Sequence, residues 1–181
     1  DSAHAQINKN EVPYLGAEIF IEPGQTPEEI DVWFKRLKEN GMTVTRIRMF
    51  ENYMRDKNGA WDYSLFDYAF KAGQKYGVKI YANLFPATAF TDVGGFKFPR
   101  DEAHLASIAN YIQHTVNHFK QFSSLYGWVP VNEPGAGYVY NEPFTQQKFT
   151  EWKAQPKEKG YDSKGFVHFD FNEERFLTDY N

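Results

Sequence analysis

An α/β fold with a parallel sheet is predicted by four short apolar runs that alternate with helical patterns along the 181 residues. The runs are rich in β-branched and aromatic residues, and each leads into a loop before the next helical pattern. Such alternation is typical of a doubly wound sheet or of a (β/α)8 barrel. The first connection lacks a GxGxxG fingerprint and no Walker A pattern is found, which disfavours the doubly wound alternative. The predicted fold is therefore a (β/α)8 TIM barrel, of which this chain holds the first four βα units.

The first βα unit begins at residues 14–21, YLGAEIFI, which form the first predicted strand. A helix follows, with Thr26 as N-cap, Pro27 at its first position and Glu29 placed to complete a capping box. Gly41 is expected to end this helix in the left-handed conformation. Its apolar positions, which keep helical spacing, are Ile30, Trp33, Phe34 and Leu37.

The second unit repeats this pattern. Residues 43–50, TVTRIRMF, are the second predicted strand, and a polar loop follows them. Ser64 is predicted to cap a second helix, which runs to Tyr76 and is closed by Gly77.

The third and fourth strands are predicted at 78–85 and 125–132, with a helix opened by Asp101 between them. The apolar positions of that helix are Leu105, Ile108, Ile112, Val116 and Phe119. A further helical pattern covers 144–155. A barrel needs roughly 250 residues. We therefore interpret residues 14–181 as the N-terminal half of a TIM-barrel catalytic domain and expect the chain to be a fragment of a longer enzyme.

Composition disfavours several classes of function. The net charge is -4, whereas nucleic-acid binders usually present a basic face. No apolar run approaches the roughly 18 residues that a membrane span needs. The chain has no cysteine, so it can form neither a disulfide framework nor a thiolate metal site. We expect neither a nucleic-acid nor a membrane partner.

Residues 1–13 are interpreted as a flexible leader. DSAHAQINKN is either the mature end left after removal of a signal peptide or a cloning remnant. The expected localisation is secreted or periplasmic, with the cytoplasm as the alternative.

Two features point to an active site at the carboxyl ends of the strands, where TIM barrels place their catalytic groups. Glu133 follows the fourth strand, where a carboxylate without a function would be buried at a cost. On the second strand, Arg46 and Arg48 alternate with Ile47 and Met49, so the arginines are expected to point into the barrel mouth. Guanidinium groups there need anionic partners, or else reach solvent.

Other candidate sites are interpreted as structural. His114 and His118 have the spacing of a helical metal pair, but His114 points away from the apolar stripe and no HExxH glutamate lies between them. Asp56, Asn58 and Asp62 are better explained as turn formers than as calcium ligands. We expect no metal and no cofactor.

Four segments taken in order carry a resemblance. They are GAE at 16–18, TRIRMF at 45–50, the segment 61–90 and VNEP at 131–134. Together they resemble the retaining (β/α)8 glycoside hydrolases of clan A, with family 42 β-galactosidases as the best match. The similarity covers about residues 14–137.

The resemblance implies a saccharide substrate that is β-linked and contains galactose. It implies that Glu133 is the general acid/base and that Asn132 hydrogen-bonds the sugar 2-hydroxyl. Arg46 matches the clan's strand-two arginine, which lies near the nucleophile. Arg100 matches a family arginine close to the sugar, and Tyr138 is expected to bind substrate.

In a retaining mechanism one carboxylate attacks the anomeric carbon while the other donates a proton to the leaving oxygen. The clan's nucleophile is a glutamate at the end of strand seven, which lies outside this chain, and Glu142 is a poor substitute by position. The fragment alone is therefore expected to be inactive, and the missing partner is the C-terminal half of the barrel or a second copy of the chain.

Two alternatives remain open. One is an endo-acting clan A enzyme on galactan, agar or mannan, with an extended cleft lined by Phe90, Phe96 and Phe98. The other is a non-catalytic, carbohydrate-binding half-barrel that associates through the exposed edge of its fourth strand.

Overall fold

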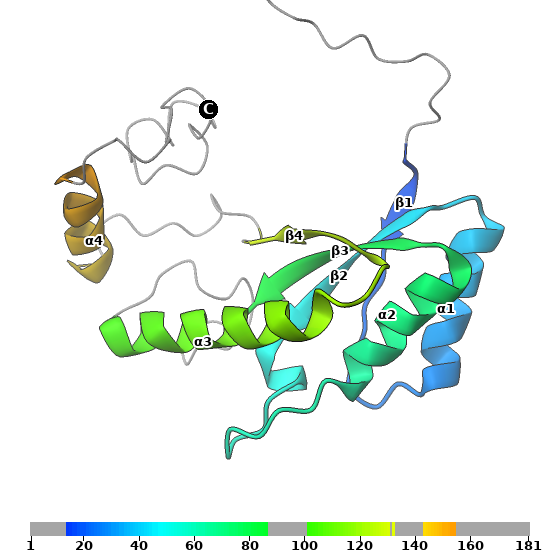
Figure 1. Cartoon of the computed structure of the whole chain (residues 1–181), viewed down its shortest axis with the longest axis horizontal. Coiled ribbons are helices and arrows are strands. Elements are labelled where there is room, and N and C mark those ends of the chain that lie inside the picture. The colour runs from blue at the N-terminus through cyan, green and yellow to red at the C-terminus, as the bar shows by residue number, and fades with distance from the viewer. Residues whose placement is uncertain (1–13, 87–100, 131, 133–142, 155–181) are drawn as a thin grey trace, which may run out of the picture. The chain divides into compact units, whose positions relative to one another are not determined.

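The computed structural model describes residues 14–86, 101–130, 132 and 143–154 (Figure 1). They fall into two compact units. The first unit contains residues up to Asn83 together with Val116–Val129, and the second contains Leu84–Thr115 and the chain from Pro130 onward.

A four-stranded parallel sheet forms the centre of the first unit, with the strand order β1-β2-β3-β4. The strands are β1 Gly16–Glu18, β2 Val44–Phe50, β3 Lys79–Phe85 and β4 Leu125–Val129. All four predicted strands are confirmed, although β1 and β4 are shorter than expected. Sequence order equals spatial order, as βα units produce it in a barrel.

Helix α1 spans Pro27–Glu39 and has the predicted capping box. The Thr26 backbone N–H donates to Glu29 Oε2 at 2.8 Å, and the Glu29 N–H donates to Thr26 Oγ1 at 3.2 Å. Gly41 ends the helix at φ 72°, as predicted. Trp33 departs from the prediction, because 42% of it is exposed although it shares the helical spacing of the buried residues.

Helix α2 spans Ser64–Tyr76 and is closed by Gly77 at φ 68°, as predicted. The predicted cap is wrong, however. Ser64 is the first helical residue, and its backbone N–H donates to Asp62 Oδ1 at 2.9 Å. The N-cap position is Tyr63, whose side chain makes no capping hydrogen bond, and the Asp62 carboxylate satisfies the first N–H of the helix from the residue before it.

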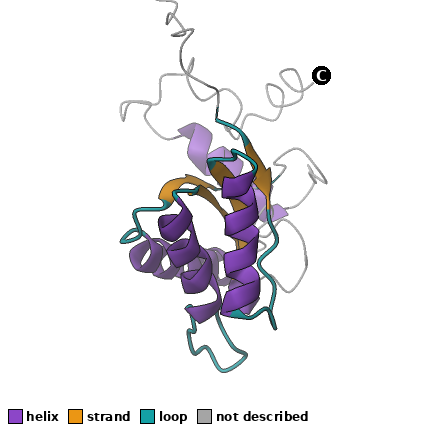
Figure 2. Cartoon of the chain, turned by 90° about the vertical axis from the view of Figure 1, so that its right-hand side faces the viewer, coloured by secondary structure: helices purple, strands orange, loops and turns teal. Residues whose placement is uncertain are grey.

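Figures 1 and 2 show α1 and α2 side by side next to the sheet. Strand β2 alternates as predicted: Thr45, Ile47 and Met49 are buried, whereas Arg46 and Arg48 are only partly covered. The apolar side chains of β2 thus join the core, and its arginines lie on the opposite face of the sheet.

Helix α3 spans Glu102–Phe119, and its last turn belongs to the first unit. Phe119 is fully buried there against Phe66 and Phe70 of α2. After the helix, the Ser124 hydroxyl donates to the Phe70 carbonyl at 2.7 Å. Gly73 of α2 leaves room for this approach, since an added Cβ would lie 3.0 Å from Ser124 Cβ.

The second unit contains the first four turns of α3 and helix α4, Pro143–Ala154. Asp101 caps α3 as predicted, because its Oδ1 accepts the His104 N–H at 2.7 Å. Lys148 of α4 forms an ion pair with Glu102 of α3. Within the described ranges, no helix is long and apolar enough to cross a membrane.

Candidate active site

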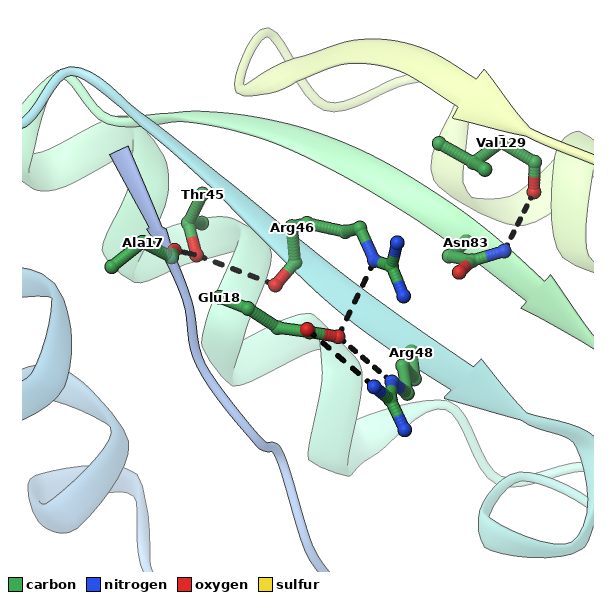
Figure 3. A network of polar contacts seen from close by, with 7 residues as sticks. All are labelled: Ala17, Glu18, Thr45, Arg46, Arg48, Asn83 and Val129. Atoms are coloured by element: carbon green, nitrogen blue, oxygen red, sulfur yellow. Dashed lines mark hydrogen bonds and ion pairs between the residues drawn. The ribbon is translucent and has the colours of Figure 1, made fainter. Parts of the chain in front are cut away.

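A cluster of three charged side chains lies where β1 ends beside β2 (Figure 3). Glu18 Oε1 lies 2.8 Å from the Nε of Arg48 and 3.3 Å from the Nε of Arg46. The second carboxylate oxygen, Oε2, accepts from Arg48 Nη2 at 3.5 Å. One carboxylate therefore forms ion pairs with two guanidinium groups. We refer to Glu18, Arg46 and Arg48 as the charged cluster.

The backbone register brings these residues together. In the parallel pairing of β1 with β2, Glu18 lies opposite Arg46. Arg48 is two residues further along β2 and therefore points to the same face of the sheet. The Thr45 hydroxyl adds a bond across the strands, donating to the Ala17 carbonyl at 2.7 Å.

The charged cluster is partly accessible. Its side chains are 34% exposed for Arg46, 28% for Glu18 and 27% for Arg48. Arg48 is also supported by Phe20, because its guanidinium carbon lies 5.0 Å from the ring centroid. Partial burial strengthens the ion pairs relative to open solvent, while the remaining exposure leaves the cluster able to contact a ligand.

Asn83 contributes a buried polar group on β3. Its side chain is fully buried, and Nδ2 donates to the Val129 carbonyl of β4 at 2.9 Å. Its Oδ1 accepts no hydrogen bond within the part of the chain that the structure describes. An unpaired buried oxygen costs free energy, so a hydrogen-bond donor from a ligand or from the rest of the protein would stabilise it.

The loops after β1 and β2 meet through a further polar pair. The Tyr53 hydroxyl, in the short helix η1 (Glu51–Tyr53), donates to Glu22 Oε2 at 2.7 Å. Gln25 fixes the first loop, because its Oε1 accepts the Glu22 N–H at 2.9 Å. Burial, together with the bond to Glu22, raises the pKa of Tyr53 to about 12.

This raised pKa predicts a dependence of stability on pH. The folded state holds the Tyr53 proton more tightly than the unfolded state, so the stabilisation is complete below pH 10 and is lost as the pH approaches 12. Tyr53→Phe is therefore expected to differ from the native protein in urea midpoint below pH 10, and this difference should shrink above it. Tyr68→Phe, at an exposed tyrosine of α2, is the control. Equal pH dependence of both variants would contradict the prediction.

The predicted site residues are only partly described. Arg46 belongs to the charged cluster, and Asn132 is buried, with 6% exposure, in the second unit. Glu133, Arg100 and Tyr138 lie outside the described residues. The same holds for Glu142 and for Phe90, Phe96 and Phe98, the three phenylalanines of the expected extended cleft.

Sequence reasoning missed Glu18 as the partner of the arginines. The signal was present, because a carboxylate that ends one strand can reach the next strand when the two are parallel. The two arginines also do not simply extend into solvent, which was the alternative explanation for them.

The histidine and aspartate positions have structural roles. His118 Nε2 lies 2.7 Å from Asp67 Oδ1, and its ring stacks on Tyr63 at a centroid distance of 4.0 Å. Asp56 Oδ1 accepts the backbone N–H groups of Asn58 and Ala60, as a turn former does. Among the residues that the structure describes, no group of three or more histidines and acids could hold a metal ion.

Comparison with known proteins gives structural matches only. No protein-family model matches the chain, and no curated protein matches it. The endo-β-1,4-mannanase from Thermotoga petrophila superposes with a TM-score of 0.53 at 20% identity, over 67% of this chain and 35% of that one. The β-galactosidase from the psychrophilic Marinomonas ef1 gives a TM-score of 0.62 at 11% identity, over 77% and 25%.

This chain has the fold of part of a TIM barrel. A family 39 glycoside hydrolase from the gut symbiont Bacteroides cellulosilyticus WH2 also matches, with a TM-score of 0.52 at 18% identity, over 76% of this chain and 29% of that one. The chain thus spans between a quarter and about a third of the length of these three structures. At such identities the likeness concerns the fold alone.

Proposed function

We propose that this chain supplies the first four βα units of a retaining glycoside hydrolase that acts on β-linked, galactose-containing saccharides. The observation that carries the proposal is the charged cluster, which lies where β1 ends beside β2 and across the sheet from the buried face of β2. TIM barrels build their active sites at this end. The glycoside hydrolases among the matched structures support the same class of reaction.

Glu133 is the proposed general acid/base. It protonates the leaving oxygen and later removes a proton from water, while a second carboxylate outside this chain attacks the anomeric carbon. In this mechanism the two carboxyls lie about 5–5.5 Å apart. Asn132 is proposed to bind the sugar 2-hydroxyl, and Arg46, Arg100 and Tyr138 are proposed to complete the substrate contacts.

The test is the stereochemistry of hydrolysis by the complete barrel. The chain joined to the remaining βα units is expected to release the β-anomer first from a β-galactoside, which NMR of the fresh product detects. Initial release of the α-anomer would contradict the retaining mechanism and indicate an inverting one. A complete barrel that hydrolyses no β-linked saccharide would remove the proposed function.

Two other functions have a specific observation in their favour. An endo-acting polysaccharide hydrolase is favoured by matched structures that are named as endo-β-1,4-mannanases, among them those from Thermotoga petrophila and Rhizomucor miehei. Faster cleavage of internal bonds in mannan than of a short galactoside would select it.

A non-catalytic half-barrel is favoured by the edge strands, because β1 and β4 each have one neighbour in the described sheet. A dimer that binds saccharide without cleaving it would select this alternative.

A further inference from the structure

We propose that Glu18 is a positioning residue that holds the guanidinium groups of Arg46 and Arg48 for the saccharide site. The inference rests on the proposed function, in which Arg46 contacts the substrate. Glu18 itself is not proposed to touch the reacting atoms. Its role is to fix where the two cations lie.

The geometry of the charged contacts supports this role. Arg48 Nε donates to Glu18 Oε1 at 2.8 Å and Arg48 Nη2 to Oε2 at 3.5 Å, while Arg46 Nε forms an ion pair with the same Oε1 at 3.3 Å. The two bonds to Arg48 set the plane of its guanidinium group, and the ion pair holds Arg46 beside it. The shared negative charge also offsets the repulsion between two neighbouring cations.

The backbone makes the position of this carboxylate well defined. Glu18 is the last residue of β1, and the pairing of Gly16 with Val44 fixes the register two residues earlier. The strands approach so closely there that a Cβ on Gly16 would lie 2.2 Å from the Val44 carbonyl oxygen. Only glycine fits this approach, and the carboxylate is therefore placed by the sheet itself.

The charged cluster is also separate from the acid pairs of the helix layer. Asp31 on α1 binds Lys75 Nζ at 2.7 Å and Tyr76 Oη at 2.6 Å, both on α2. Asp31→Asn therefore removes one acidic charge and one ion pair outside the site. This makes it a matched control for Glu18→Gln, which keeps the side-chain length and an amide oxygen but loses the charge.

The first experiment uses the 181-residue chain and does not depend on activity. In NMR spectra of the arginine Nε–H groups, the signals of Arg46 and Arg48 are expected to exchange slowly with solvent. Glu18→Gln should speed up the exchange of both signals at least several-fold, whereas Asp31→Asn should leave it unchanged. Unaltered exchange in Glu18→Gln would overturn the positioning role.

The second experiment measures the consequence in the complete barrel. Glu18→Gln is expected to lower kcat/KM by about 10- to 100-fold, mainly through a higher KM, because misplaced binding groups weaken substrate contacts. Glu18→Asp, which keeps the charge, should recover part of this loss, and Asp31→Asn should match the native enzyme. Altered arginine exchange with unaltered kinetics would overturn the link to the substrate. A native barrel without glycosidase activity would instead refute the proposed function and leave the exchange result standing.

Discussion

Replacing Glu133 with glutamine is expected to lower kcat of the complete enzyme by about 10²- to 10⁴-fold on substrates whose leaving group is a sugar hydroxyl. Glutamine neither donates a proton to the leaving oxygen nor accepts one from the attacking water. Both halves of the proposed reaction are therefore slowed. Substrate binding should change little, since the variant keeps the size and polarity of the side chain.

The leaving group provides a sharper version of this experiment. In an aryl glycoside with an acidic phenol, the phenolate leaves without being protonated. Glu133→Gln should therefore still form the glycosyl-enzyme at a nearly native rate. Water attack then lacks its base, and a burst of phenol release should precede slow turnover. Steady-state kinetics that match the native enzyme on both classes of substrate would exclude Glu133 from the mechanism. Glu142→Gln changes another acid, nine residues later in the sequence, and is expected to retain activity.

Local signals predicted the helices well because the groups involved are neighbours in the sequence. The capping box of α1 needs only Thr26 and Glu29, three residues apart, and the structure contains both of its hydrogen bonds. The alternation of β2 is equally local, since burial of Ile47 and Met49 follows from a period of two. The α/β fold class followed from these repeated units.

Packing on a particular side of a helix could not be predicted in this way. Trp33 has the spacing of a core residue, yet 42% of it is exposed, whereas Ile30, Phe34 and Leu37 of the same helix are buried. Periodicity identifies the apolar face, but it does not say how many neighbours cover that face. The predicted cap of α2 was wrong because Ser64 is already the first helical residue, and the Asp62 carboxylate accepts its N–H.

The charged cluster was predictable in its residue types but not in its pairing. Partly buried arginines require an anion, and a carboxylate does lie near Arg46 and Arg48. Its identity depends on the β1 to β2 register, which no single strand encodes. The sequence of one strand therefore cannot identify Glu18 as the partner, because the pairing of Glu18 with Arg46 arises from the register between the two strands.

Replacing Phe119 with alanine is expected to lower the free energy of unfolding by about 3–5 kcal/mol, the usual cost of removing a buried phenylalanine. Phe119 is fully buried, and its ring lies 4.7 Å from Phe70 and 6.4 Å from Phe66, measured between centroids. Urea unfolding should show the loss directly. Phe119→Leu, which keeps most of the apolar volume, should cost much less, and Tyr68→Ala at an exposed position of α2 is the surface control.

The reason for so large an effect is the position of Phe119 in the chain. It ends α3 and packs the last turn of that helix on α2, and the chain then runs through Ser124 directly into β4. A cavity at Phe119 would thus loosen the strand that precedes Asn132 and Glu133 in the sequence. Within the complete enzyme, Phe119→Ala should therefore lose activity at temperatures below its unfolding transition, whereas Tyr68→Ala should not. If activity and unfolding fall together at one temperature, Phe119 stabilises the fold without positioning β4.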